Sequence, residues 1–388
     1  MVHSEQRIPE LDGLRGTAVL MVLIWHFVGC MVDPGGSWIE AALYSGTIFG
    51  RTGVDLFFVL SGFLIIGILI DNRAADNLFP SFYGRRIARI FPAYFLLIVV
   101  YWLCYAATGP TAAFNAAHGL LIHAGAQVLF AYNWLMAIDN GPVSRGFSVT
   151  WSVAIEEQFY LVAPLVVWLT PRSRLWKVLL GGALFAVLSR AAMFIALPSH
   201  ALAPYVLPFS RIDCLCAGGL LALAWRNDVA FGYLKKIAPG ALAILSALAF
   251  FMVYCIVTGD LNSHMYFWGH SLLSAFYFFV LLFVLTRRPA IFRSPSLTFL
   301  GTISYGLYLF HPLMISLFFQ AAGRPERVAS LVDAGLALGA LVASIAFCAT
   351  SYFFLEKPIR RLGRRLSYDH RSGDRPLIGA IDGAATIR

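Results

Sequence analysis

The chain has 388 residues, of which 59% are hydrophobic and only 13% are charged. Soluble domains have roughly 45–50% apolar and about 25% charged residues, so this composition excludes an ordinary water-soluble enzyme. Its cysteines fall inside apolar stretches, and Cys214 and Cys216 have no neighbouring histidine or second cysteine pair, which argues against a zinc site. The formal net charge is +9, and in a membrane protein the positions of the basic residues indicate first how the chain is oriented.

Long apolar runs indicate how the chain crosses that membrane. A helix needs about 20 apolar residues to cross the hydrocarbon core of a bilayer. Ten runs of about that length occur, at residues 14–32, 47–70, 87–107, 150–170, 176–197, 206–225, 237–258, 266–286, 298–319 and 328–355. A weaker run at 117–136 contains His118, His123 and Gln127, and we interpret it as a re-entrant or interfacial helix. The sequence therefore predicts an all-α polytopic membrane protein with about ten transmembrane helices.

The positions of Lys and Arg predict the orientation of these helices. Cytoplasmic loops carry an excess of both residues. Basic loops, such as Arg85–Arg89 and Arg172–Lys177, alternate with cation-poor loops when ten spans are assigned, and the alternation breaks with eleven. We therefore expect both termini in the cytoplasm, with residues 1–366 forming one transmembrane domain. The polar, Gly-rich tail at 367–388 is predicted to be disordered.

Ionisable side chains at membrane depth are costly, and each is therefore a functional candidate. Arg15 lies at the cytoplasmic end of the first span, and His26 follows eleven residues later. At 1.5 Å per residue that separation is roughly 16 Å and almost three turns, so both side chains share one helix face. The alternative interpretation is a snorkelling arginine and a hydrogen-bonded core histidine.

The second and third spans add further candidates. Asp55 enters from the outer side, at an expected depth similar to that of His26, and a carboxylate beside an imidazole fixes its tautomer. The alternative is a helix cap. Arg86 and Arg89 share a face at the start of the third span, beside Arg85. They could bind a phosphate-rich ligand. Alternatively, they reflect only the general excess of basic residues in cytoplasmic loops.

The fourth span opens with Trp151, followed by the adjacent carboxylates Glu156 and Glu157. Adjacent side chains point about 100° apart, so one glutamate can pair with a cation while the other faces a substrate. We expect both in the outer half of the membrane. Arg211 and Asp213 begin the sixth span and could form an internal ion pair.

The ninth span carries Ser304, Tyr308 and His311 on one stripe, with Pro312 as a kink. We assign no role to the remaining histidines of the outer loops and interface, which are His118, His123, His200, His264 and His270.

Together the candidates form a basic cytoplasmic cluster and an outer cluster suited to acid–base chemistry on a hydroxyl. The sequence shows no nucleophilic serine elbow, metal-ligand set or phosphate-binding glycine loop.

These segments together resemble the acyltransferase 3 family of bacterial membrane O-acyltransferases. The resemblance covers about residues 7–361, and the matching segments in chain order are Glu10–Gly16 with His26, Gly53–Gly62, Arg86–Arg89, Trp151–Tyr160, Arg211–Asp213, Ser304–Pro312 and Glu356–Pro358. Some members of this family carry an additional periplasmic esterase-like domain, which we do not expect here.

The resemblance implies a multi-pass enzyme of the bacterial inner membrane. Its co-substrate would be acetyl-CoA or another acyl-CoA, with no metal and no tightly bound cofactor. Its acceptor would be a sugar of a surface or exported glycan, such as an exopolysaccharide or lipopolysaccharide, free or lipid-linked. It also implies that His26 is the essential catalytic residue and that Arg15, Arg86 and Arg89 serve the donor.

We expect direct transfer, in which His26 takes the acceptor proton and is oriented by Asp55 or by Glu156 or Glu157. Transfer through a covalent acyl-enzyme intermediate is an alternative mechanism. The acceptor-side or structural residues are Trp151, Arg211, Asp213, Tyr308 and His311. A small-molecule acceptor such as a macrolide sugar is the alternative, and a transporter of an anionic solute is the alternative from another class. We expect no nucleic-acid partner.

Overall fold

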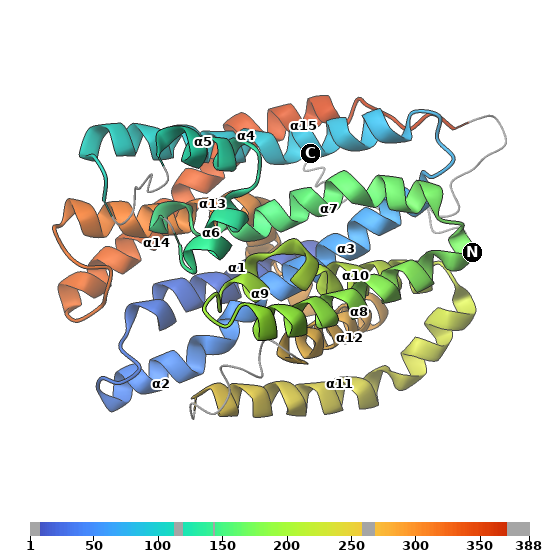
Figure 1. Ribbon diagram of the computed structural model, residues 1–388, viewed down its shortest axis with the longest axis horizontal. Helices are drawn as coiled ribbons and strands as arrows, with labels where there is room; N and C mark the ends of the chain where they lie inside the picture. Colours follow the sequence, from blue (N-terminus) through green and yellow to red (C-terminus); the bar gives the residue numbers. More distant parts are fainter. Residues whose placement is uncertain (1–7, 112–118, 143, 258–267, 371–388) are drawn as a thin grey trace.

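The structure is a computed structural model that describes residues 8–111, 119–142, 144–257 and 268–370. The helices are α1 (Pro9–Phe27), α2 (Trp38–Thr47), α3 (Gly53–Asp71), α4 (Leu78–Thr108), α5 (Leu120–Val128), α6 (Tyr132–Asp139), α7 (Thr150–Leu169), α8 (Arg172–Ala196), α9 (Ala203–Val206), α10 (Ile212–Trp225), α11 (Asp228–Val257), α12 (His270–Arg287), α13 (Pro295–Ala321), α14 (Leu331–Ser351) and α15 (Lys357–Gly363) (Figure 1). Of the residues discussed above, His118 and His264 lie outside the described ranges.

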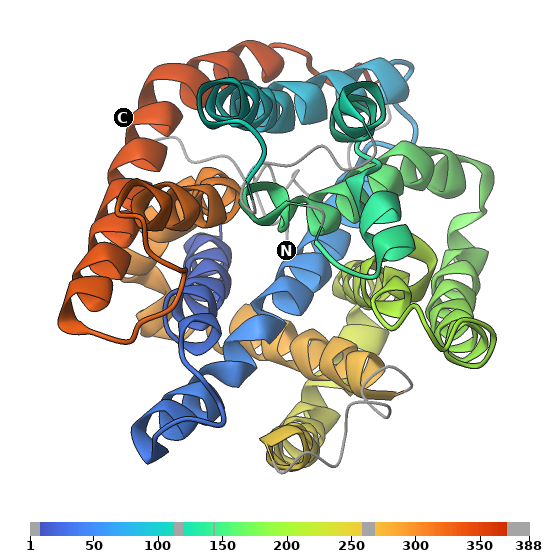
Figure 2. The same ribbon diagram turned by 60° about the vertical axis from the view of Figure 1, so that its left-hand side comes forward.

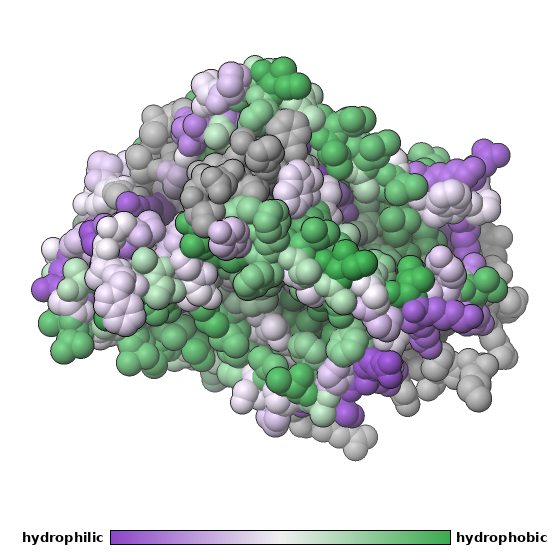
Figure 3. Space-filling view, turned by 90° about the horizontal axis from the view of Figure 1, so that it is seen from below, coloured by the Kyte–Doolittle hydropathy of each residue, from purple (hydrophilic) through white to green (hydrophobic). Residues whose placement is uncertain are grey.

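The described part of the chain confirms the all-α polytopic class. It contains nine helical segments that are long and apolar enough to cross a membrane, together with the shorter apolar helix α10. No strand occurs among these residues. Viewed from one side, apolar side chains cover much of the surface between hydrophilic groups near the two ends of the long axis (Figure 3). That distribution suits a protein surrounded by lipid.

Two predicted segments differ from the structure in their details. The sixth predicted span, at 206–225, is not one continuous α-helix: α9 ends at Val206, Pro208, which lacks an amide hydrogen, begins a 3₁₀ turn, and α10 begins at Ile212. The weak run at 117–136 contains α5 and the first part of α6, helices of nine and eight residues. At 1.5 Å per residue each is about 12–14 Å long, too short to cross a bilayer.

Helices α1 and α3 run through the middle of the bundle, with the other long helices around them (Figure 2). Glycine lets their neighbours approach closely. A Cβ atom on Gly16 would lie 2.0 Å from the Leu297 carbonyl oxygen of α13, and one on Gly62 would lie 2.0 Å from the Leu215 carbonyl oxygen of α10. Small residues permit such backbone contacts inside membranes. The pairs α1–α13 and α3–α10 are therefore fixed in register.

The first four residues of the segment predicted to be disordered, 367–370, are ordered against the rest of the protein. The side-chain amide nitrogen of Asn77 donates to the Ser367 carbonyl at 2.9 Å and to Asp369 Oδ2 at 2.7 Å. The backbone N–H of Asp369 donates in turn to Asn77 Oδ1 at 2.9 Å. Residues 367–370 are thus held against the α3–α4 connection by polar contacts, while 371–388 lie outside the described residues.

The cytoplasmic location of both termini stays a prediction, and reporter fusions can test it. A topology reporter placed after Arg174 should face the cytoplasm, and one placed after His200 should face the opposite side, because α8 separates these positions. A result with both reporters on the same side would contradict the ten-span assignment.

Candidate active site

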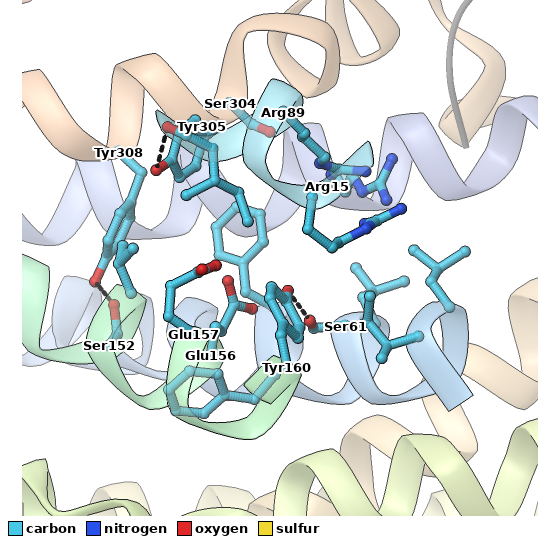
Figure 4. Close-up of a pocket in the computed structure, with 18 of the residues that line it drawn as sticks. Arg15, Ser61, Arg89, Ser152, Glu156, Glu157, Tyr160, Ser304, Tyr305 and Tyr308 are labelled. Atoms are coloured by element: carbon cyan, nitrogen blue, oxygen red, sulfur yellow. Dashed lines mark hydrogen bonds between the residues drawn. The ribbon is translucent and has the colours of Figure 1, made fainter. Parts of the chain in front are cut away.

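A cavity of about 90 Å³ lies between α1, α3, α4, α7 and α13. Arg15 of α1 and Arg86 and Arg89 of α4 line it, together with Glu156 and Glu157 of α7. Figure 4 shows the Arg15 and Arg89 guanidinium groups lying close together, with the two glutamates further along the cavity. The structure thus brings together three predicted donor-site arginines and two predicted catalytic carboxylates.

The basic end of this cavity contains more groups than the sequence analysis assigned. An adjoining cavity of about 30 Å³ shares Arg15 and Arg89 with the first and is also lined by Glu356 and Arg360. Glu356 Oε1 is buried and has no hydrogen-bond partner among the residues that the structure describes. The only signal for these residues was the Glu356–Pro358 motif, to which we had attached no role. Four arginines therefore line the two adjoining cavities, and three of them, Arg15, Arg89 and Arg360, line the smaller one.

The two glutamates require a correction of the sequence analysis. We expected them in the outer half, facing an acceptor, but they share a cavity with the arginines of the predicted cytoplasmic side. The reason is that α7 begins inside the protein, where Phe147 and Thr150 are fully buried. Residues one to two turns further along are consequently deeper than a count from the surface indicates. Glu157 Oε1 is buried without a hydrogen-bond partner in the described structure.

Hydroxyl groups line the remainder of the cavity. The Ser61 and Tyr160 hydroxyls are hydrogen-bonded at 2.5 Å, and the Ser152 and Tyr308 hydroxyls at 2.6 Å (Figure 4). Tyr308 also donates to the Val149 carbonyl at 3.2 Å. Tyr308 and Ser152 line the cavity, whereas His26 and His311 do not. The hydrogen-bonded pair Tyr308–Ser152 lies at the end of the cavity away from Arg15 and Arg89 (Figure 4).

Two histidines that do not line the cavity lie near Tyr308. The ring centroid of His311 is 6.0 Å from that of Tyr308 and 4.7 Å from that of His26. The contact joins α1 to α13, the pair of helices that glycine brings together. His26 and His311, which the sequence analysis had assigned to separate roles, thus form one pair.

Both imidazoles are held by carbonyl oxygens of their own helices. His26 Nδ1 lies 2.9 Å from the Val22 carbonyl oxygen, and His311 Nδ1 lies 3.1 Å from the Leu307 carbonyl oxygen. A carbonyl oxygen can only accept, so each Nδ1 carries a hydrogen and each neutral ring keeps a lone pair on Nε2. His311 is fully buried, and its Nε2 atom has no hydrogen-bond partner in the described structure. His26 is partly exposed, so its Nε2 is the more accessible base.

The expected contact between Asp55 and His26 is wrong. Asp55 accepts a hydrogen bond from Arg211 at 2.7 Å and lies 3.7 Å from His270 Nδ1. Its helix, α3, begins at Gly53, which packs against Ala18 of α1, about two turns deeper than His26. Asp55 is therefore below the histidine pair and neutralises a buried arginine instead.

Arg211 and Asp213 also have partners other than those expected. Arg211 immediately precedes α10, and its guanidinium forms an ion pair with Asp55. Asp213 instead accepts from Arg190 at 2.8 Å. Trp151 lies beside this network, since the Arg211 guanidinium carbon is 5.9 Å from its ring centroid. Trp151, Arg211 and Asp213 thus belong to a charged cluster separate from the arginine-lined cavity.

The sequence analysis missed two members of this charged cluster, Arg190 and His270, and a third buried residue, His123, which packs against Tyr101 and Tyr132. Arg190 was treated as part of an apolar run, and His123 and His270 were assigned to outer loops or the interface. All three are at least 98% buried. Arg190 could have been found, because an arginine within an apolar helix of membrane depth is itself a signal.

Comparison with known proteins agrees with the resemblance of the motifs. A family model described as an acyltransferase domain matches residues 8–354. The chain is 27% identical to the peptidoglycan O-acetyltransferase OatA of Listeria monocytogenes over 93% of its length, and 27% identical to the O-acetyltransferase OatA of Staphylococcus aureus over 93%. It spans 57% and 58% of the lengths of these two relatives. No solved structure matches the chain. Since the family model covers nearly all of the described bundle, the chain belongs to the acyltransferase 3 family.

Proposed function

We propose that this protein is an O-acetyltransferase of the bacterial cytoplasmic membrane that uses acetyl-CoA and acetylates a sugar hydroxyl of a surface or exported glycan. The family and the names of the relatives support acyl transfer to oxygen. The observation that carries the proposal is the cavity that runs from four arginines to Tyr308, with the His26–His311 pair immediately beyond. The peptidoglycan acceptor of the Listeria relative is the first acceptor to test.

The donor would enter from the arginine end. Guanidinium groups bind phosphate oxygens through paired hydrogen bonds, and CoA carries phosphates at one end and its thioester at the other. Arg86, Arg89 and Arg360 would hold the phosphates, with Arg15 at the entrance to the deeper part. The distance from Arg15 to His26 along α1 is roughly 16 Å, which an extended pantetheine arm can bridge.

We assign Glu156 and Glu157 to the donor arm and to proton handling within this cavity. A pantetheine arm carries amide N–H groups, and carboxylate oxygens accept hydrogen bonds from such donors. The buried Glu157 oxygen without a partner would gain one when the arm is bound. When ionised, the carboxylates would also balance the charge of Arg15 and Arg89, which line the same cavity.

The reaction follows from the tautomer of His26. Its Nε2 lone pair takes the proton of the acceptor hydroxyl as the oxygen attacks the thioester carbonyl carbon. A new C–O bond forms, the C–S bond breaks, and the thiolate of CoA leaves. The imidazolium of His26 then returns the proton to that thiolate, which yields acetyl ester, CoA thiol and neutral histidine. Before the attack, Tyr308 must turn away from Ser152 so that the thioester reaches the histidines.

The function can be tested with the purified protein in lipid vesicles. Radiolabelled acetyl-CoA and soluble peptidoglycan fragments should give labelled ester and free CoA in equal amounts. Release of CoA without labelled fragments would point to another acceptor. Absence of CoA release with every glycan offered, from properly folded protein, would overturn the proposal.

Arg86→Ala and Arg89→Ala should each raise the KM for acetyl-CoA roughly ten- to a hundredfold. A hydrogen bond to a charged group contributes about 1.5–3 kcal/mol, which corresponds to that range. Initial rates at varied acetyl-CoA concentration in vesicles provide the measurement. Arg85→Ala is the matched control, because Arg85 donates to the Leu366 carbonyl at 2.7 Å and does not line the cavity. Equal KM values in all three variants would remove the donor site from this cavity.

A further inference from the structure

A second cavity, of about 140 Å³, lies on the other side of α3. Its wall is formed by the 3₁₀ turn Ile48–Thr52, the first turn of α3, and parts of α9, α11 and α12. It shares no lining residue with the arginine-lined cavity. A water molecule occupies about 30 Å³ of liquid, so the space suits several waters or one six-membered ring.

The hydrogen-bonding state of His270 at this cavity is fixed by its neighbour. The Arg211 guanidinium is hydrogen-bonded to His270 Nδ1. Arginine can only donate, so Nδ1 is the acceptor and the ring hydrogen of neutral His270 is on Nε2. His270 is 2% exposed, and Nε2 has no hydrogen-bond partner among the described residues. A buried N–H donor without a partner costs free energy that a ligand oxygen would recover.

The rest of the lining combines aromatic rings with one accessible cation. The Tyr205 ring lies 5.6 Å from the His270 ring, and Phe49 contributes a second aromatic side chain to the wall. Arg51 also lines the cavity, and its side chain is exposed. Apolar ring faces beside well-placed donors suit a sugar, whose carbon faces are apolar and whose rim carries hydroxyls.

The 3₁₀ turn that lines the cavity also contacts the outer end of α1, next to His26. The guanidinium carbon of Arg51 is 5.4 Å from the ring centroid of Trp25, the residue that precedes His26. On the same turn, a Cβ on Gly50 would lie 3.1 Å from Trp25 Cβ. One side of this turn therefore faces the outer end of α1, and the other side faces the cavity. A chain of linked sugars could extend from His26 past Arg51 into it.

We propose that this cavity binds one sugar ring of the acceptor, adjacent to the ring whose hydroxyl reacts at His26. His270 Nε2–H would donate to a ring hydroxyl, the Tyr205 and Phe49 rings would pack against the sugar faces, and Arg51 would contact the polar rim at the entrance. The proposal rests on the proposed function, because it assumes an oligosaccharide acceptor. It predicts that acceptors of two or more sugars are preferred over a single sugar.

Kinetics with short acceptors test the proposal. The probes are N-acetylglucosamine and the N-acetylglucosamine–N-acetylmuramic acid disaccharide, with labelled acetyl-CoA in vesicles. Arg51→Ala and His270→Phe should each raise the KM for the disaccharide about tenfold. Neither should change the KM for acetyl-CoA, because neither residue lines the arginine-lined cavity. Arg145→Ala is the matched control, since Arg145 is an exposed arginine of the predicted outer side that does not line the cavity.

The outcomes separate this inference from the proposed function. Unchanged disaccharide KM values in both Arg51→Ala and His270→Phe, with transfer intact, would overturn the acceptor cavity and leave the enzyme assignment standing. If His270→Phe does not fold, Arg51→Ala decides alone, because Arg51 is exposed. If wild-type protein transfers nothing, the proposed function fails. Thermal stabilisation of the purified protein by the disaccharide, absent in Arg51→Ala, would then still support the cavity, and no stabilisation would overturn it.

Discussion

His26→Ala should lower the rate of acetyl transfer by a factor of about 10²–10⁴, the usual contribution of general acid–base catalysis. The substitution removes the Nε2 lone pair that takes the hydroxyl proton and leaves the arginine-lined cavity unchanged, since His26 does not line it. Binding of acetyl-CoA should therefore be retained. The measurement is labelled ester formed in vesicles at matched protein amounts, together with equilibrium binding of acetyl-CoA.

His311→Ala is the informative companion variant. His311 has no hydrogen-bond partner for its Nε2 in the described structure and lies 4.7 Å from His26 between ring centroids, so it supports His26 rather than reaching the donor cavity. We expect a smaller loss and a higher KM for the acceptor. His200→Ala, in the connection between α8 and α9, should behave as wild type. If His311→Ala loses all transfer activity while His26→Ala keeps most of it, then His311 is the base.

Asp55→Ala should reduce the free energy of unfolding by about 3–5 kcal/mol, because it leaves the Arg211 charge buried without its carboxylate. Arg211 is completely buried, and aromatic rings surround it, with Tyr205 at 5.1 Å and Phe58 at 5.8 Å from the guanidinium carbon. Unfolding of the purified protein in mixed detergent micelles provides the measurement. A loss of activity in this variant should follow the loss of folded protein.

Two further variants distinguish a structural role of Asp55 from a catalytic one. In the double variant Asp55→Leu with Arg211→Met both charges are absent, so most of the lost stability should return. Asp33→Ala removes one of the two carboxylates that pair with the exposed Arg327 and should leave unfolding nearly unchanged. If Asp55→Ala folds with wild-type stability yet transfers no acetyl group, Asp55 acts in the chemistry after all.

Much of the fold could be predicted because length and hydropathy decide it. A run of about 20 apolar residues has few stable arrangements other than a membrane-crossing helix, and most predicted spans have a long helical counterpart. The exceptions have local causes. Pro208 begins a 3₁₀ turn that separates α9 from α10, and the turn at Ile48–Thr52 lets α3 begin below the surface, against Ala18. Neither effect changes the mean hydropathy of the run.

The candidate site could be predicted only in part. Helix periodicity correctly placed Arg86 and Arg89 on one face, and together with Arg15 they line one cavity. Periodicity and depth do not show which helices pack against each other in the bundle. For that reason Asp55 was matched with His26, although its partner is Arg211 from a helix more than 150 residues later in the chain. The close approach of α1 and α13 depends on Gly16 and Gly301, whose effect becomes visible only in three dimensions.

The contact between Tyr308 and Ser152 also bears on ion leakage. A continuous column of water through a membrane protein would let protons flow along the membrane potential, which is worth about 2.3 kcal/mol per charge for each 100 mV. Among the described residues, the arginine-lined cavity ends at these two hydroxyls, and the ring of Phe57 lies 6.0 Å from that of Tyr308. In the proposed reaction, these side chains would keep the two sides of the membrane electrically insulated between turnovers. A donor arm that fills the same passage would maintain the insulation while Tyr308 is displaced.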